Sequence, residues 1–134
     1  MYTHAEISTE PLPKDATDEQ KAKQLPDPSG YMLLVGLPTI DEKTAGGVYR
    51  PDQLRDQEQV ASIVGFVMKM GPDAYSDKKR FPSDPWCKKG DFVLFKSYTG
   101  IRFEMHGQEF RLISDDSVFG VVEDPRALSS IRRL

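Results

Sequence analysis

The amino-acid sequence predicts an all-β fold, either a small barrel or a sandwich. Between Tyr31 and Val122, six or so short apolar or alternating segments are separated by turn residues, which is the pattern of such folds. A chain of 134 residues can bury one core, because domains typically have about 100–150 residues. We therefore expect a polar arm over residues 1–28, one β domain over residues 29–124 and a short tail over residues 125–134.

The N-terminal arm is expected to be flexible or to be ordered by a partner. Four prolines interrupt any strand in it: Pro11, Pro13, Pro26 and Pro28. One short helix is predicted, because Thr17 can cap a helix over Asp18 to Gln24. So short a helix is marginal unless it packs against something.

The first two long apolar segments predict the central strands. Tyr31 to Leu37 is a compact apolar run that ends at Pro38, and it suits a buried strand better than a helix. Val60 to Met70 is rich in β-branched and large side chains. Gly65 inside this segment indicates a bulge or a bend, which a small closing barrel requires.

Two shorter segments follow after a long connection. Phe92 to Phe95 is apolar throughout and predicts a third strand. Ile101 to Met105 alternates, so Ile101, Phe103 and Met105 are expected on the buried face of an antiparallel strand. 

The last two strands are joined by turns. His106-Gly107 is the predicted turn into Glu109 to Ile113, which should place Phe110 and Leu112 on one face. Val118 to Val122 is the final apolar strand. The tail from residue 125 can form one or two helical turns.

The connection over residues 41–59 contains the adjacent glycines Gly46 and Gly47. Two neighbouring glycines cost backbone entropy inside a strand or helix, so they indicate a turn or a mobile segment. This connection is the most unusual feature of the chain.

The connection over residues 71–90 combines aromatic side chains with the basic run Lys78-Lys79-Arg80. Such a loop can bind nucleic acid through base stacking and phosphate contacts. The alternative is a solvated loop whose aromatics, Tyr75, Phe81 and Trp86, pack locally or against a neighbouring subunit.

Charge and composition argue against several kinds of partner. The formal net charge of −3 gives no reason to expect nucleic acid or an anionic membrane. Cys87 is the only cysteine, which fits a reducing compartment. No apolar run approaches the length of a membrane span, and the N-terminus has no secretory signal pattern. We expect a cytoplasmic protein.

Catalytic and metal-binding patterns are also lacking in the sequence. Cys87 and His106 could meet in space, but nothing near either resembles a nucleophile elbow. Asp115-Asp116 and Asp41-Glu42 stand where turns favour carboxylates that bond their own backbone. The sequence has no phosphate-binding loop, no dinucleotide motif and no metal-ligand spacing. We expect neither an enzyme nor a bound cofactor or metal.

Several motifs together resemble the chaperonin-10 (GroES-like) co-chaperonin family. Lys43-Thr44-Ala45-Gly46-Gly47-Val48 resembles its mobile-loop signature, and Lys89-Gly90-Asp91-Phe92-Val93-Leu94-Phe95 resembles its Val-Gly-Asp strand. Tyr98-Thr99-Gly100 and the segment Asp116 to Val122 resemble its Tyr-Gly turn and its closing strand. Each motif alone is weak, whereas the ordered set from Pro28 to Glu123 is specific.

The resemblance implies a small GroES-like barrel with a mobile loop at about residues 41–59 and a roof loop at about residues 71–90, assembled as a heptameric ring. It implies a co-chaperonin that caps a GroEL-type chaperonin and assists folding in the enclosed chamber, with ATP used by the partner. The implied chaperonin-binding residues are Gly46, Gly47, Val48, Tyr49, Arg50 and Leu54. The implied roof residues are Tyr75, Phe81 and Trp86.

Two features depart from the family pattern. The family places an apolar tripeptide after the glycines, whereas this chain has Val48-Tyr49-Arg50. Arg50 could extend its stem along an apolar groove, Leu54 could act as a displaced anchor, or the loop could have lost chaperonin binding. The second departure is the pair of tails.

A long chain with tails and a variant loop is more similar to the co-chaperonin-like proteins of bacteriophages than to an ordinary bacterial member. Such a protein would act in the host cytoplasm on a substrate such as a capsid protein. Two other readings stay open. One is a virion structural or adaptor protein built on the same barrel, and the other is an OB-like nucleic-acid module.

Overall fold

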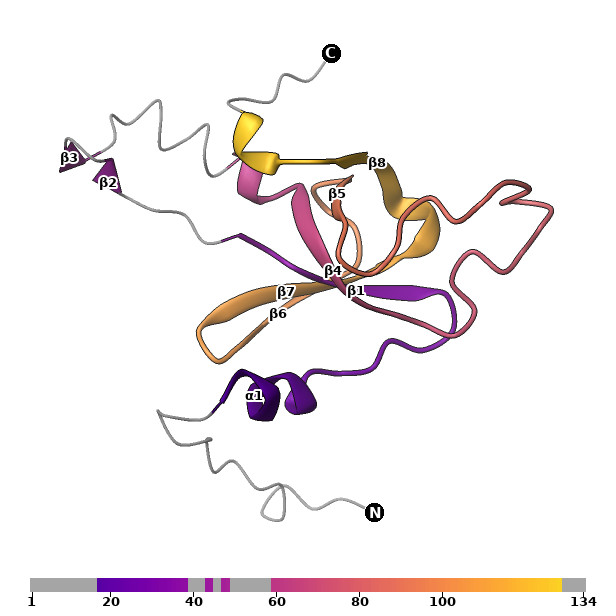
Figure 1. Cartoon of the computed structure of the whole chain (residues 1–134), viewed down its shortest axis with the longest axis horizontal. Coiled ribbons are helices and arrows are strands. Elements are labelled where there is room, and N and C mark those ends of the chain that lie inside the picture. The colour runs from indigo at the N-terminus through magenta and orange to yellow at the C-terminus, as the bar shows by residue number, and fades with distance from the viewer. Residues whose placement is uncertain (1–16, 39–42, 45–46, 49–58, 129–134) are drawn as a thin grey trace.

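Strands dominate the structure, a computed structural model that describes residues 17–38, 43–44, 47–48 and 59–128 (Figure 1). The helical elements are short: α1 (Asp18–Gln24), η2 (Asp115–Ser117) and η3 (Pro125–Ala127). The strands are β1 (Met32–Gly36), β2 (Lys43–Thr44), β3 (Gly47–Val48), β4 (Val64–Met70), β5 (Phe92–Phe95), β6 (Ile101–Met105), β7 (Gln108–Ser114) and β8 (Val118–Val122).

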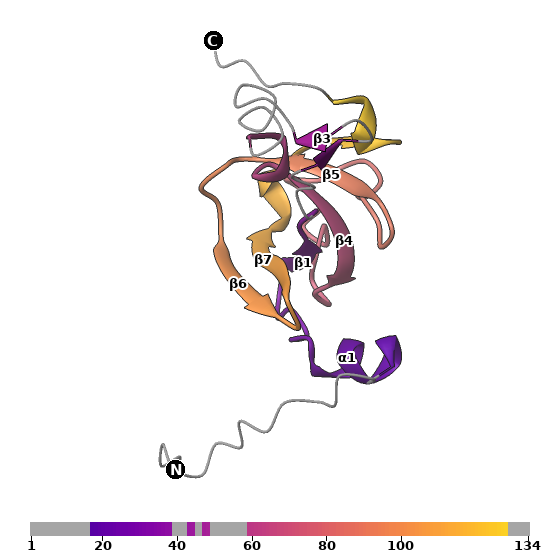
Figure 2. The ribbon, with the colours of Figure 1, turned by 90° about the vertical axis from the view of Figure 1, so that its left-hand side faces the viewer.

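Six of these strands form one antiparallel sheet in the order β6-β7-β1-β4-β5-β8. The sheet curls on itself (Figure 2), so Ile113 of β7 and Val118 of β8 lie in one apolar cluster although three strands separate them in the sheet. The hydroxyls of Thr99 and Ser117, 2.9 Å apart, also join the β5–β6 connection to η2. The predicted all-β barrel is confirmed.

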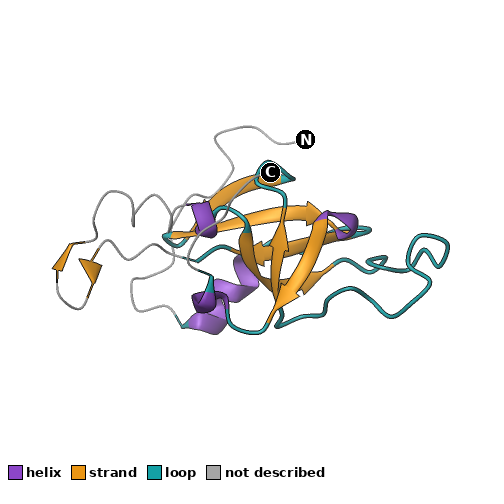
Figure 3. Cartoon of the chain, turned by 90° about the horizontal axis from the view of Figure 1, so that it is seen from above, coloured by secondary structure: helices purple, strands orange, loops and turns teal. Residues whose placement is uncertain are grey.

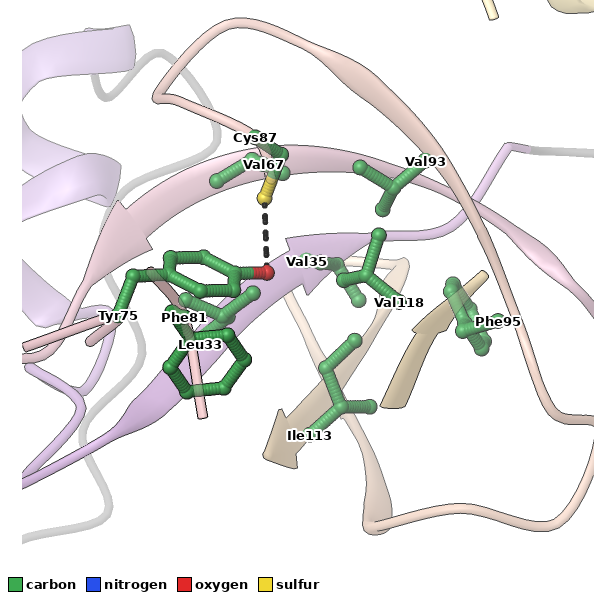
Figure 4. Packing of buried hydrophobic residues seen from close by; sticks show 10 residues of the cluster. All are labelled: Leu33, Val35, Val67, Tyr75, Phe81, Cys87, Val93, Phe95, Ile113 and Val118. Carbon is green, nitrogen blue, oxygen red and sulfur yellow. Dashed lines mark hydrogen bonds between the residues drawn. The ribbon is translucent and has the colours of Figure 1, made fainter. Parts of the chain in front are cut away.

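The main core fills the inside of the curled sheet (Figure 4). It combines side chains from five strands with three from the 71–90 loop: Leu33, Val35, Val67, Tyr75, Phe81, Cys87, Val93, Phe95, Ile113 and Val118. A second cluster of Leu25, Leu34 and Phe110 lies on the other face. β1 is therefore covered on both faces, as its uninterrupted apolar sequence predicts.

The predicted strands are confirmed, with two corrections at their ends. The fourth strand begins at Val64, because residues 59–61 are helical and Ile63 N donates to Val60 O at 3.2 Å. Ile101 was expected to be buried but is 62% exposed, since it starts an edge strand. Phe103 and Met105 pack against the second cluster.

Gly65 does not lie at a bulge, which was one of the two features predicted from it. It pairs regularly with Val93, while the register of β4 slips at Met68, which has no partner on β1. A methyl group at position 65 would lie 2.9 Å from both Phe95 Cε1 and Val35 Cβ. Glycine is present here because the strand packs too closely for a side chain.

The short N-terminal helix is confirmed over the predicted residues. The Thr17 hydroxyl accepts from Gln20 N at 3.1 Å, and Thr17 N donates to Gln20 Oε1 at 2.8 Å, which completes a capping box. The helix lies below the β6–β7 hairpin in Figure 1, on the side away from β8. Residues 1–16 and 129–134 lie outside the described residues, and the domain boundaries stay predictions.

Candidate functional site

The first long connection contains a small hairpin formed by β2 and β3. Lys43 pairs with Val48 and Thr44 with Gly47 in an antiparallel arrangement. These four residues form a sheet of their own, drawn apart from the six-stranded sheet in Figure 1 and Figure 3. Gly47, the second glycine of the pair, is the first residue of β3, whereas Gly46 lies outside the described residues.

The structure thus describes the backbone at two of the predicted chaperonin-binding residues, Gly47 and Val48. The other four, Gly46, Tyr49, Arg50 and Leu54, lie outside the described residues. Chaperonin binding by all six stays a prediction.

The second long connection projects from the other end of the barrel in Figure 3, yet its base is fastened to the core. Tyr75 N donates to Asp115 Oδ2 at 2.9 Å, and the Tyr75 hydroxyl donates to Asp115 O at 2.8 Å. The same hydroxyl lies 3.4 Å from Cys87 Sγ. One buried tyrosine therefore connects both ends of the loop to η2.

The three predicted roof aromatics form one cluster, but they differ in exposure. Phe81 contacts Tyr75 and Trp86 with ring centroids 5.0 and 4.8 Å away. Tyr75 and Phe81 are 1% and 2% exposed, whereas Trp86 is 44% exposed. Tyr75 and Phe81 therefore pack in the core and Trp86 keeps an exposed surface, while a role of these residues in lining a roof stays a prediction.

Sequence reasoning missed the role of Asp115. The sequence placed Asp115 and Asp116 in a turn with local backbone bonds, whereas Asp115 is 2% exposed and bonds Tyr75 forty positions away. Asp116 pairs with Arg80 of the same loop and accepts from Ser114 Oγ at 2.6 Å. The Ser114 bond and then Arg80 hold the pKa of Asp116 below its usual value. No local pattern could have signalled these long-range contacts.

Trp86 also lines an open cleft beside the edge strand β8. The cleft has a volume of about 510 Å³ and is lined by Trp86, Asp116, Val118, Phe119 and Gly120. Phe119 is 68% exposed, because β8 has an irregular register at this residue that turns its side chain outwards. Val121 of the same strand is also exposed, at 47%.

Cys87 and His106 have unrelated surroundings. The Cys87 thiol is buried beside Tyr75, and burial raises the pKa of both groups. His106 is exposed at the β6–β7 turn with a φ of 54°. Within the described ranges, no three His, Cys, Asp or Glu side chains are placed to hold a metal ion. No described helix is long and apolar enough to cross a membrane.

Comparisons with known proteins identify the family. The family model described as the chaperonin 10 Kd subunit matches residues 27–122. The co-chaperonin GroES of Geobacter sulfurreducens is 36% identical over 91 residues, which cover 68% of this chain and 90% of the relative. That of Rubrobacter xylanophilus is 31% identical over 97 residues, which cover 72% and 96%, and that of Caldicellulosiruptor saccharolyticus is 28% identical with the same coverage.

The match includes the barrel, the hairpin and the 71–90 loop, while most of the arm and the tail lie outside it. With its curled six-stranded sheet and its hairpin between β1 and β4, this chain belongs to the chaperonin-10 family.

Proposed function

We propose that this protein is a co-chaperonin that caps a GroEL-type chaperonin ring and assists ATP-dependent folding in the enclosed chamber. The observation that carries the proposal is the hairpin β2–β3 in a chain of the chaperonin-10 family. A loop whose sequence carries a few apolar residues and that becomes ordered on binding gives a weak and reversible contact, and several such loops on one ring bind by avidity. The residues proposed to bind are Gly46, Gly47, Val48, Tyr49, Arg50 and Leu54.

A ring of identical copies, expected to be a heptamer, is the second part of the proposal. It is supported by the exposed apolar side chains of Trp86, Phe119 and Val121, which surround the unpaired edge of β8. Apolar side chains on an edge strand are a usual site of association. In such a ring the 71–90 loops would approach the central opening.

The remaining parts concern chemistry and location. We propose that the chain holds no cofactor and catalyses no reaction, and that its partner supplies the ATP hydrolysis. We propose that it acts in the cytoplasm, which would be the host cytoplasm for a bacteriophage protein, and that its substrates include a capsid protein. The relatives given above are bacterial co-chaperonins, and no observation favours a virion structural protein.

The test mixes the protein with a GroEL-type chaperonin, ATP and an unfolded substrate, and follows ring complexes by electron microscopy and refolding by recovered activity. Val48→Asp should abolish both, because every loop of the ring would carry the charge. Ile101→Asp is the matched control, since it puts the same charge on an exposed β-branched residue outside the hairpin. No complex with the unaltered chain, or normal capping by Val48→Asp, would refute the proposal.

A further inference from the structure

The outer face of the sheet carries an apolar stripe that the main core does not use. Its side chains come from four adjacent strands, β6, β7, β1 and β4. Leu34 and Phe110 are buried, and Met68, Phe103, Met105 and Leu112 are partly exposed around them. We call these six residues the seat. The outside of a small barrel is usually polar, so an apolar stripe there needs an occupant.

The irregular register of β4 builds one edge of the seat. Leu34 pairs with Lys69 and Val35 with Val67, which leaves Met68 as an extra residue. Consecutive strand residues normally point to opposite faces. Here Met68 packs in the seat, and Lys69 Nζ reaches the segment that crosses it. Such bulges commonly re-aim side chains beside binding sites.

The occupant in this structure is Leu25, the residue after α1. Leu25 is 7% exposed and packs against Leu34 and Phe110. Its backbone is extended, with φ −67° and ψ 140°. Lys69 Nζ donates to Leu25 O at 3.1 Å and to Asp27 Oδ1 at 2.8 Å. The seat and the neighbouring Lys69 thus hold a leucine side chain, its carbonyl group and an acidic residue two positions later.

Before Pro28, which is buried where the segment joins the sheet, the segment that supplies Leu25 is held at one apolar point. Among the described side chains of residues 17–27, Leu25 alone is buried, and those of α1 are largely exposed. The ion pair of Lys69 with Asp27 is weak because the Asp27 side chain is 89% exposed. A helix of seven residues is also too short to persist without packing. The segment can thus leave the seat without breaking a strand pairing.

We propose that residues 17–27 form a releasable strap and that the seat is a peptide-binding surface. The partner is an extended polypeptide segment with a leucine-like side chain followed two residues later by an acidic one. The strap shows the chemistry that the seat accepts, and two flexible methionines allow related side chains to fit. The family match begins at residue 27, so Leu25 lies outside the matched residues while all six seat residues lie inside them.

A labelled synthetic peptide of residues 17–30 tests this inference on the full chain. Leu25→Ser should bind the peptide at least about tenfold more tightly than the unaltered chain, because burying a leucine side chain is worth roughly that factor or more. Lys23→Ser, a change at an exposed strap residue, should leave binding at the unaltered level. Adding Phe103→Ser to Leu25→Ser should remove the gain, as should replacing leucine by serine in the peptide.

Three results would overturn the proposal. Folded Leu25→Ser that binds the peptide no better than the unaltered chain would show that the seat is no binding surface. Tight binding that survives Phe103→Ser would place the peptide elsewhere. A Leu25→Ser chain that cannot fold, judged by circular dichroism, would show that Leu25 is a core residue required for folding and cannot be released from the seat. Asp27→Asn gives a milder release, and it should tighten peptide binding by less than Leu25→Ser does.

Discussion

Tyr75 is the residue on which the 71–90 loop depends. It has a φ of 60°, in the left-handed region that a non-glycine residue occupies only when its surroundings compensate. The compensation comes from Asp115, which accepts from the Tyr75 amide through Oδ2 and from the Tyr75 hydroxyl through its backbone oxygen. The strained backbone and the buried carboxylate therefore depend on each other.

Tyr75→Phe should lower the free energy of unfolding by about 1 kcal/mol or somewhat more, because Asp115 O would lose a buried donor. Tyr31→Phe is the matched control, since the Tyr31 side chain is 55% exposed, and it should change stability by less than about 0.5 kcal/mol. Urea unfolding of both variants measures the difference. Equal stabilities would mean that the bond from the Tyr75 hydroxyl contributes nothing to folding.

The buried pair of Cys87 and Tyr75 should make the protein sensitive to alkali. Burial raises the pKa of both groups, so the folded chain keeps protons that the unfolded chain loses as the pH rises. The contribution of the Cys87 thiol to the free energy of unfolding is therefore fully present below its ordinary pKa of about 8.5. Above that pH the contribution declines, by at most about 1.4 kcal/mol per pH unit. Tyr75 adds to the decline above about pH 10. In Cys87→Ala, urea titrations should show the decline starting near pH 10; an unchanged onset would contradict the assignment.

Arg111 is a buried cation that the apolar pattern of its strand did not announce. It is 0% exposed, and Nη1 donates to Ser97 O at 2.7 Å. Nε and Nη2 have no partner in the described part of the chain. Burial, and then the charge of Arg102, lowers the pKa of Arg111. The guanidinium lies 5.1 Å from the ring centroid of Phe95, which offsets part of the desolvation cost.

Arg111→Met should raise the free energy of unfolding by about 1 kcal/mol. It removes the short hydrogen bond that the charged guanidinium donates to Ser97 O, worth about 1.5–3 kcal/mol, and a long one to Lys96 O at 3.4 Å, and it relieves a desolvation penalty of several kcal/mol. Arg102→Met removes only an exposed pair with Glu109 and should change stability by less than about 1 kcal/mol. Thermal unfolding compares the two. Marked destabilisation by Arg111→Met would mean that the bond to Ser97 outweighs the burial of charge.

At the scale of elements, close packing around β4 explains why Gly65 is a glycine. The Gly65→Ala methyl would lie 2.9 Å from Phe95 Cε1 and from Val35 Cβ, and overpacking of this kind costs about 1–3 kcal/mol. In Gly36→Ala the nearest atom is the end of the flexible Gln108 side chain at 3.1 Å, so the cost should stay below about 1 kcal/mol. Urea midpoints of the two variants give the comparison, and equal midpoints would show that β1 and β5 can move apart.

The six strands of the main sheet could be predicted from local patterns because each one is an apolar or alternating run with a turn at its ends, whereas the two-residue strands β2 and β3 were not predicted. The capping pair of Thr17 and Gln20 likewise signals α1. The contacts of Tyr75 with Asp115, and the burial of Arg111, depend on which strands become neighbours, and no local pattern encodes that. The candidate loop was found through its glycine pair in the sequence, whereas the seat around Leu25 appears only once four strands lie side by side.

At the scale of the whole molecule, the contacts of Tyr75, Phe81 and Cys87 predict that the 71–90 loop unfolds together with the barrel. These three side chains are core members although the loop projects from the sheet. Trp86 is the only tryptophan, and it contacts Phe81 with ring centroids 4.8 Å apart. Its fluorescence therefore reports on the loop, while far-ultraviolet circular dichroism reports on the strands.

The two signals should give coincident urea transitions, as expected for one cooperative unit. A fluorescence transition at lower urea would show instead that the loop opens locally before the barrel does. Asp115→Ala should produce that separation, because it removes the carboxylate that holds the Tyr75 amide and leaves the strand pairings in place. Coincident transitions in the unaltered chain and separated ones in Asp115→Ala would together show that a single buried carboxylate couples the projecting loop to the barrel; separated transitions in the unaltered chain would refute the coupling.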